Sequence, residues 1–490
     1  MICVSSNFSV YNYVHEDTAF SDHDLVKICV TFDSTYERGP GVWKNNVKYY
    51  TDESFLDEFK DFWEDHIASN SNYNRNRVNW WMDFKYKFKL FYIKYCRNKL
   101  LFSRRHDQML ENCLYNAIVS LEQNPSCRLS AQNYSRIKKQ LVDSKIKKTK
   151  EKVLKSTAQY IMQGEKPIKS FFEKFKNKKE NKPITSFLDK EGNECFELKG
   201  IIKITEEYYK ELFSVREIRQ PIMNLFLNNI APLNGFDQLM ANLTVYFSLE
   251  EIWDAIVSLK NGRSPGPDGI TIEFYKAVFD IIKHDLRYVL NCFLDRCKIP
   301  AKCKAGFMTL TPKDEPYNDV ENRRPITLLN TDYKIFTKMI VKRLDPILKE
   351  IIHSSQYAQP GKDIQKMNTV IRDLVSDMEL SSSDSFFVSV DFRKAYDSVN
   401  HDFLFRVFEQ YGFPTDFVNI VKEIFRDAGS HILINGHKSR KIKLKSGIRQ
   451  GCPSGRPFFT VQLNPLLVFL NDERLSNIFL SIKLCRIKSF

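Results

Sequence analysis

Hydrophobic residues in the first third of the chain recur at the spacing of helices. Between residues 51 and 160, large apolar side chains return every three or four positions, which places them on one face of a helix. The residues with this period are Phe55, Phe59, Phe62, Trp63, Trp80, Trp81, Phe84, Phe88, Phe91 and Tyr95. The lysines interleaved with them are Lys85, Lys87, Lys89 and Lys94. Aromatic rings among lysines can stack on single-stranded nucleic acid, but helical spacing favours a buried core with a solvated basic face.

The second half of the chain mixes helical and extended patterns. Residues Ser248–Glu251 form a capping-box sequence that opens a helix. Apolar runs at 307–312 and 386–390 predict strands, and the runs that flank Asn435-Gly436 predict a β-hairpin with a type I′ turn. The pair Asp397-Ser398 predicts the cap of a further helix. We therefore expect an α/β (α+β) fold.

The chain is long and basic. Its 490 residues suffice for two or three domains, and a hydrophobic content of 43% indicates a globular protein. The formal net charge of +14 favours a polyanionic partner, most simply nucleic acid. Residues 134–183 carry sixteen Lys and Arg against five Asp and Glu. Because this surplus is concentrated in a tenth of the chain, it predicts a phosphate-binding stripe rather than an ordinary solvated face.

Two features bear on the compartment. No stretch approaches eighteen consecutive apolar residues and the N-terminus lacks a signal pattern, so we expect no membrane partner. The eleven cysteines are scattered without a Cys-x-x-Cys pair, which is typical of reduced thiols in an intracellular protein.

Asp391 is the first candidate for metal chemistry. It directly follows the apolar run 386–390 and precedes a polar turn. A carboxylate held rigidly at the end of a buried strand suits a hard cation such as Mg²⁺. An aspartate that merely ends a strand and caps the next turn has the same spacing, so the pattern alone leaves both interpretations open.

Four segments then appear in a fixed order. Residues Arg263–Ile270 form a rigid turn with two prolines and two glycines, where the backbone can approach another molecule closely. Asn322–Asn330 reads Asn-Arg-Arg-Pro-Ile-Thr-Leu-Leu-Asn, Asp391–Asp397 reads Asp-Phe-Arg-Lys-Ala-Tyr-Asp, and Ser446–Pro453 reads Ser-Gly-Ile-Arg-Gln-Gly-Cys-Pro. Together they resemble the fingers and palm motifs of the reverse transcriptases of non-LTR (LINE-type) retrotransposons.

The resemblance implies an RNA-directed DNA polymerase. Such an enzyme copies an RNA template by adding deoxynucleoside triphosphates to the 3′-hydroxyl of a DNA primer, often one nicked in chromosomal target DNA. Magnesium would be the cofactor, and its protein ligands would be the Asp391 carboxylate and the Phe392 carbonyl. The family acts in the nucleus, which this sequence does not itself indicate.

The resemblance also assigns contacts with the nucleotide. The residues concerned are Lys313, Arg323, Arg324, Phe392, Tyr396, Gln450 and Gly451. Lys313 and Arg324 match basic positions that face the triphosphate, and Arg323 is a possible substitute. Tyr396 matches the aromatic residue under the incoming sugar, and Gln450-Gly451 matches a pair that contacts template and nucleotide.

The resemblance extends toward the N-terminus. Ser21-Asp22-His23 is similar to the closing motif of the apurinic-type endonuclease that precedes the polymerase in many of these elements. The implied roles are attack on a DNA phosphate assisted by His23, with Asp22 orienting the imidazole, although we expect no cleavage by this remnant. We therefore predict an endonuclease remnant at 1–36, a basic helical linker at 37–240, and reverse transcriptase fingers with a partial palm at 241–490.

Two departures from the family pattern bear on activity. The apolar residue expected between Pro453 and Ser454 is missing, which could rotate the helix that follows. An Asp-Asp pair, which supplies two more metal-binding carboxylates in the family, occurs nowhere in the sequence. A single carboxylate leaves Mg²⁺ with most of its waters, so we expect a truncated polyprotein fragment that is inactive as an enzyme.

Two other interpretations stay open. The chain can be a non-catalytic nucleic-acid-binding protein derived from the same family, which uses the basic stripe and the fingers. A group II intron-type maturase shares the palm, but the Ser21–His23 remnant argues against it.

Overall fold

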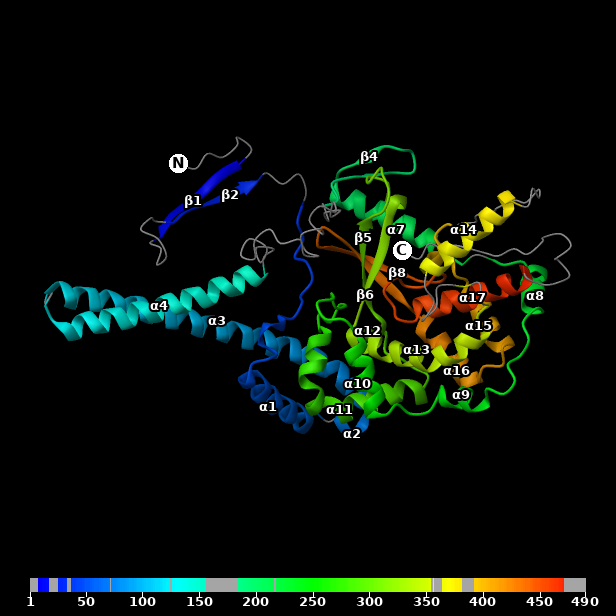
Figure 1. Cartoon of the computed structure of the whole chain (residues 1–490), viewed down its shortest axis with the longest axis horizontal. Coiled ribbons are helices and arrows are strands. Elements are labelled where there is room, and N and C mark those ends of the chain that lie inside the picture. Colours follow the sequence, from blue (N-terminus) through cyan, green and yellow to red (C-terminus); the bar gives the residue numbers. More distant parts are fainter. Residues whose placement is uncertain are drawn as a thin grey trace. The chain divides into compact units, whose positions relative to one another are not determined.

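The computed structural model describes residues 8–16, 25–32, 37–70, 72–123, 126–155, 183–215, 217–353, 356, 364–380 and 392–470. Helices and small sheets make up this part of the chain (Figure 1), which confirms the mixed fold class. The chain forms two compact units: one contains Met1–Glu37 and Leu90–Lys182, and the other contains Arg38–Lys89 and Pro183–Phe490. The predicted domain limits at residues 36 and 240 stay predictions.

The first unit contains a strand pair and two long helices. Its elements are β1 (Phe8–Glu16), β2 (Leu25–Phe32), the C-terminal part of α3 (Arg77–Gln123) and α4 (Arg128–Lys155). The two strands are antiparallel. The Ser144 hydroxyl on α4 donates to the Asp107 carboxylate on α3 at 3.0 Å, and Ile137 and Leu141 of α4 are buried.

Aromatic side chains form the core of the N-terminal part of the second unit. The elements here are η1 (Val47–Tyr49), α1 (Glu53–Ser69), α2 (Asn72–Arg75) and the start of α3. The Trp63 and Phe84 rings lie 4.8 Å apart, and Phe88 packs 4.3 Å from Phe274 of α11 (Ile272–Asp295). The helical period therefore belongs to a packed core, and its members are buried, apart from the half-buried Phe62 and Phe91, rather than available for stacking on nucleic acid.

Lys85 departs from the predicted solvated basic face. Only 6% of its side chain is exposed, and its ammonium lies 2.9 Å from the Asp268 carboxylate and 2.7 Å from that of Asp332. Burial alone would lower the pKa of Lys85, but the nearby carboxylates, Asp332 foremost, raise it well above its ordinary value. Lys85 therefore stays charged and joins α3 to the turn at residues 263–270 and to α13 (Thr331–Ile351).

Residues 38–46, called the strap below, run along two other parts of the second unit. The amide of Gly39 donates to the carbonyl of Asn435 at 2.9 Å, which holds the strap on a β-hairpin turn. The amide of Asn45 donates to the carbonyl of Gly269 at 3.0 Å. Gly269 has a φ of 73°, and a Cβ there would lie 2.2 Å from the Trp43 ring, so only glycine fits beside the strap.

A four-stranded sheet lies at the centre of the second unit. Its order is β6 (Arg323–Leu329), β5 (Gly306–Pro312), β7 (Gly429–Ile434) and β8 (His437–Lys443). β5 and β7 are parallel and the other neighbours are antiparallel. Asn435 and Gly436 join β7 to β8 with positive φ angles of 49° and 90°, as a type I′ turn requires, which confirms the predicted hairpin.

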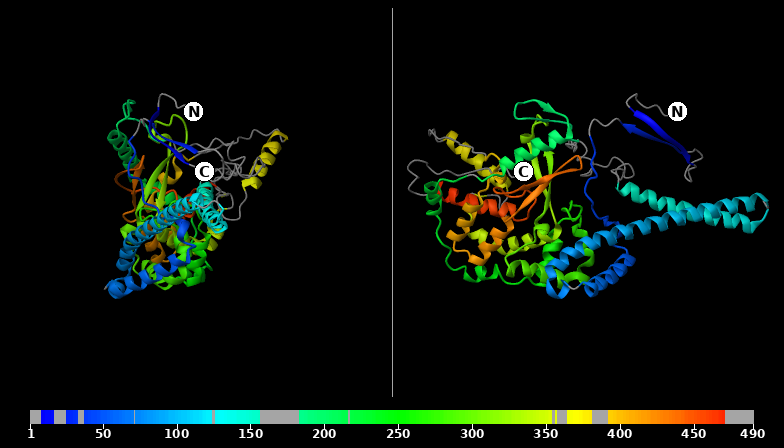
Figure 2. Two further views of the ribbon diagram at one scale, coloured as in Figure 1. Left: turned by 90° about the vertical axis from the view of Figure 1, so that its left-hand side faces the viewer. Right: turned by 180° about the vertical axis from the view of Figure 1, so that it is seen from behind.

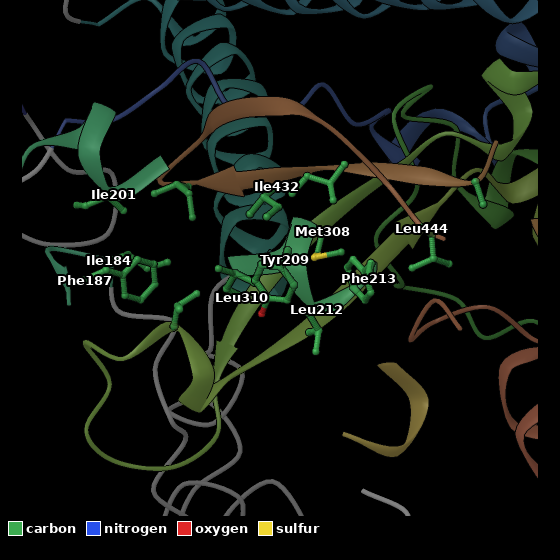
Figure 3. Packing of buried hydrophobic residues seen from close by; sticks show 14 residues of the cluster. Ile184, Phe187, Ile201, Tyr209, Leu212, Phe213, Met308, Leu310, Ile432 and Leu444 are labelled. Carbon is green, nitrogen blue, oxygen red and sulfur yellow. The ribbon is translucent and has the colours of Figure 1, made fainter. Parts of the chain in front are cut away.

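Helix α7 (Leu198–Leu212) covers one face of this sheet. Figure 3 shows Tyr209 and Leu212 directed toward Met308 and Leu310 of β5, with Ile432 of β7 beside them. All five side chains are buried. A short hairpin precedes this helix and consists of β3 (Phe187–Leu188) and β4 (Glu194–Cys195).

Helices make up the rest of the second unit. They are α8 (Gln220–Leu227), α9 (Asp237–Asn242), α10 (Leu249–Ser258), α11, α12 (Ala301–Lys304), η2 (Val320–Asn322), α13, α14 (Ile364–Leu380), η3 (Ala395–Ser398), α15 (His401–Gln410), α16 (Thr415–Phe425) and α17 (Gly455–Leu470). The predicted capping box is present, since Ser248 and Glu251 bond each other's backbone. Helices α13, α15, α16 and α17 pack as one group (Figure 2). Within the described ranges, every helix is too short or too polar to cross a membrane.

The buried ion cluster generates a stability prediction. Replacing Lys85 by alanine leaves two carboxylates in the core without their cation, so the free energy of unfolding should fall by about 3–5 kcal/mol. Lys87→Ala is the matched control, because Lys87 is 44% exposed and pairs with Asp83 at 3.0 Å on the same helix. Its cost should stay below about 0.5 kcal/mol. Denaturant unfolding measures both, and equal losses for the two variants would contradict the buried role of Lys85.

Candidate functional site

Three segments that are far apart in the sequence meet at one junction. They are the loop around Tyr396, the turn around Gln450 and strand β6. The amide of Ile448 donates to the carbonyl of Tyr396, and the amide of Thr327 in β6 donates to the carbonyl of Gln450, both at 2.7 Å. Because these bonds join backbone to backbone, the junction positions the three segments without depending on side-chain conformation.

Two glycines allow this close approach. Gly447 has a φ of 85°, and a Cβ there would lie 2.8 Å from the carbonyl oxygen of Asp397. Gly451 has a φ of 110°, and a Cβ there would lie 2.5 Å from the carbonyl oxygen of Thr327. Both the left-handed backbone and the lack of space therefore require glycine.

The buried side chain of Arg449 holds the Gln450 turn in place through hydrogen bonds. This role was not predicted from the sequence. One nitrogen of the Arg449 guanidinium donates to the hydroxyl of Tyr333 at 2.6 Å, and another donates to the carbonyl of Lys304. Lys304 in turn pairs at 2.7 Å with Glu423 of α16, and both of these side chains are less than 5% exposed. The only local sign of Arg449's role is a cation placed between Ile448 and the Gln450-Gly451 pair.

Tyr396 lies at the surface of this junction. Its ring stacks on Phe459 of α17 with 5.2 Å between the centroids, and burial raises the pKa of its hydroxyl. Phe392, at the start of the same loop, is 40% exposed. The loop thus carries one exposed ring, Phe392, and one ring, Tyr396, that packs on α17.

The structure separates the two neighbouring arginines of β6. Arg323 faces the covered side of the sheet, where its guanidinium donates twice to the carbonyl of Tyr317 at 2.8 and 3.0 Å and lies 5.5 Å from the Phe187 ring. Arg324 points to the opposite side, because successive residues of a strand alternate, and it is half-buried. Lys313 follows β5, and its ammonium pairs with Asp314 at 3.2 Å.

Asp397 is not the helix cap that its sequence suggests. The cap of α15 is Asn400, whose side chain accepts from the amide of Phe403 at 2.9 Å. Asp397 lies earlier, in η3, with 5% of its surface exposed. Burial raises the pKa of its carboxyl to about 7, and the ammonium of Lys394 opposes that rise. The cap prediction failed because an Asn three residues later occupies the position where the helix begins.

Other predicted site residues fall outside the described ranges. These are Asp391, Asp22 and His23. Among the residues that the structure describes, no three His, Cys, Asp or Glu side chains converge in a way that could hold a metal ion.

Residues 311–484 match the family model of reverse transcriptase (RNA-dependent DNA polymerase). The chain contains a reverse transcriptase domain. The match takes in β6, the Tyr396 loop and the Gln450 turn, so the junction described above lies inside the reverse transcriptase domain.

Curated relatives of the chain are proteins of transposons and other mobile elements. The transposon TX1 uncharacterized 149 kDa protein of Xenopus laevis is 26% identical over 469 residues, which cover 94% of this chain and 35% of that protein. A Pol polyprotein from the type-1 retrotransposable element R2 of Popillia japonica is 28% identical and covers 46% of this chain and 30% of its own length. The RNA-directed DNA polymerase from mobile element jockey of Drosophila melanogaster is 24% identical, with 44% and 24% covered.

These similarities confirm the resemblance to non-LTR retrotransposon reverse transcriptases. The chain spans about a third of the length of the relatives it matches, or less. The endonuclease remnant and the individual site residues of the reverse transcriptase domain stay predictions.

The junction predicts a difference between two glycine substitutions. Gly451→Ala should destabilise the reverse transcriptase domain more than Gly412→Ala, because Gly412 also has a positive φ, 83°, but has nothing within 4 Å of its Cβ position. The strained backbone alone costs about 1–2 kcal/mol, and the contact with Thr327 adds to it at Gly451 only. Denaturant unfolding of both variants measures the difference. Equal losses in the free energy of unfolding would show that the Gln450 turn makes no close steric contact with β6.

Asp397 predicts a pH dependence of stability. Its ordinary pKa is 3.8 and its pKa in the folded protein is about 7. Between these values the unfolded chain releases the proton while the folded chain keeps it, so this contribution is complete below pH 4 and is lost as the pH rises to 7. Asp397→Asn should therefore stabilise the protein by about 2–4 kcal/mol at pH 8 and have little effect at pH 4. Urea unfolding at the two pH values measures this, and a variant that is less stable at pH 8 would refute it.

Proposed function

We propose that this chain takes part in RNA-directed DNA synthesis, with RNA as template, a DNA primer and deoxynucleoside triphosphates as substrates. The observation that carries the proposal is the backbone junction of the Tyr396 loop, the Gln450 turn and β6 within the region that matches reverse transcriptases. It sets the predicted sugar-contacting ring and the predicted template-contacting pair into one rigid arrangement. Retrotransposon relatives support the same function, and we propose the nucleus as its site.

The side chains of this site have separate proposed roles in binding the nucleotide and the template. Lys313 and Arg324 neutralise the triphosphate, since a transferring phosphoryl group needs fixed cations around its oxygens. Tyr396, held by Phe459, supports the sugar and crowds a ribose 2′-hydroxyl. Gln450 contacts the template–nucleotide pair. Arg323 has no proposed role in binding the triphosphate, because its guanidinium is buried against the carbonyl of Tyr317.

Reverse transcriptases generally use a divalent metal, and we propose magnesium here. Asp391 and the carbonyl of Phe392 are the residues that would hold it. Bound there, it would supply Lewis-acid chemistry at the primer hydroxyl and at the leaving pyrophosphate.

Binding to nucleic acid without catalysis is the second candidate function. Helix α4 favours it, because ten Lys and Arg stand there against two Asp and Glu. Such a helix attracts phosphate groups whatever the state of the catalytic residues.

Primer extension distinguishes the two candidates. The unmodified chain and Asp391→Ala are each incubated with Mg²⁺, an RNA template, a DNA primer and labelled deoxynucleotides. Incorporation above the Asp391→Ala level supports polymerase activity. Tight binding of the hybrid without incorporation supports the non-catalytic function, and the absence of both would refute both.

The basic helix generates a prediction about salt dependence. Each phosphate contact contributes roughly 0.9 to the slope of log K against log salt on duplex DNA. Replacing Arg136, Lys138 and Lys139 by glutamine should therefore reduce that slope by roughly 2–3. The control replaces three exposed lysines of α7 by glutamine: Lys199, Lys203 and Lys210. Equal slopes for the two triple variants, measured by anisotropy titration, would place the phosphate contacts elsewhere.

A further inference from the structure

The end of the β5–β6 hairpin is connected to the loop that follows residue 391. Glu321 lies in η2 at this end, and its amide donates to the Asp319 side chain at 2.8 Å. Across the hairpin, the amide of Lys313 donates to the carbonyl of Asn322 at 3.0 Å. Glu321 is thus built into the hairpin segment that also carries Lys313 and Arg324.

Two cations of the loop converge on this carboxylate. One guanidinium nitrogen of Arg393 bonds Oε1 of Glu321, and the ammonium of Lys394 lies 3.2 Å from the same oxygen. Lys394 has a φ of 52°, a left-handed backbone conformation that residues other than glycine rarely adopt. Its ammonium also bonds the hydroxyl of Tyr208 and lies 4.6 Å from the centre of that ring.

These groups line a groove between α7 and the loop. The lining residues are Tyr208, Glu211, Leu212, Glu321, Arg393, Lys394 and Ser398. The two ion pairs among these lining residues join the hairpin end to the loop. They differ in strength, because Arg393 is 81% exposed and its pair is screened by water, whereas Lys394 is only 23% exposed.

We propose that Glu321 is a positioning residue for the incoming nucleotide. By pairing with Arg393 and Lys394, it holds the hairpin end that carries Lys313 and Arg324 at a fixed place relative to the Tyr396 loop. The inference rests on the proposed function, because it gives these cations and this loop a common ligand, the deoxynucleoside triphosphate. Glu321 does not touch that ligand, since a carboxylate repels phosphate oxygens.

This role and simple electrostatics give opposite expectations. If charge alone mattered, removing the carboxylate that faces Arg393 and Lys394 would strengthen the binding of a triphosphate. If Glu321 positions the hairpin, the same change weakens binding, because the cations are no longer held in one arrangement. The sign of the effect therefore decides between the two.

The experiment measures the dissociation constant of Mg²⁺-dTTP for the full chain bound to an RNA template with a blocked DNA primer, so that no turnover is needed. Glu321→Gln should weaken dTTP binding by roughly tenfold, the size expected for losing hydrogen bonds between charged groups. Glu321→Asp keeps the charge and should retain tighter binding than Glu321→Gln. Glu350→Gln, an exposed position on α13, is the matched control and should bind as the unmodified chain does. Thermal unfolding of each variant checks that the fold is kept.

Each result has one consequence. Weaker binding by Glu321→Gln with an unchanged melting temperature, and partial recovery in Glu321→Asp, supports the positioning role. Unchanged or tighter binding by Glu321→Gln overturns it, and so does an equal loss in Glu321→Asp. Failure of the unmodified chain to bind dTTP at all refutes the proposed function itself, which is a separate outcome.

Discussion

The buried cluster of Lys85, Asp268 and Asp332 is the interaction on which the arrangement of the second unit depends. Taking such charges out of water costs several kcal/mol for each ion, so the cluster is tolerated only because its members satisfy one another. The indole of Trp81 and the amide of Ile270 donate further hydrogen bonds to the two carboxylates. A buried cation of this kind accepts few alternative geometries. It therefore fixes how the start of α3, the Pro- and Gly-rich turn and α13 pack together.

A second constraint acts at the junction of the Gln450 turn, the Tyr396 loop and β6. The turn with Gln450 is attached to β6 and to the Tyr396 loop by main-chain bonds, while Arg449 fixes its underside through Tyr333 and Lys304. Lys304 itself is neutralised by Glu423 in another buried pair. Side chains exposed at this surface can thus change during evolution without moving the backbone that presents them. Rigid support of this kind is what positioning a nucleotide requires.

Local patterns predicted local structure well and distant contacts poorly. The capping box at Ser248, the Asn435-Gly436 hairpin and the aromatic period before residue 95 each follow from chemistry within one element, and each was confirmed. Lys85 was misjudged because its partners lie about 180 and 250 residues away, and nothing in a helical period reveals them.

The candidate site shows the same division between local and distant information. The order of the motifs identified the family and located the Tyr396 loop and the Gln450 turn. The different roles of Arg323 and Arg324 could not be predicted from the sequence, because the two residues lie on opposite faces of β6. Only the packing of α7 on the sheet shows which face is covered. The partnership of Glu321 with the loop after residue 391 has no local signature, since it joins two turns of unrelated sequence.

The strap has a consequence for how the region can diverge among related elements. Because residues 38–46 complete the surroundings of Gly269 and of the Asn435-Gly436 turn, a substitution in them meets the packing constraints of both turns, although more than two hundred residues separate them in sequence. The segment from Leu90 to Lys182, here called the excursion, belongs to the first unit, and the residues on both sides of it belong to the second. Changes of length should accumulate in that excursion, whereas the residues before it are inherited together with the domain they support.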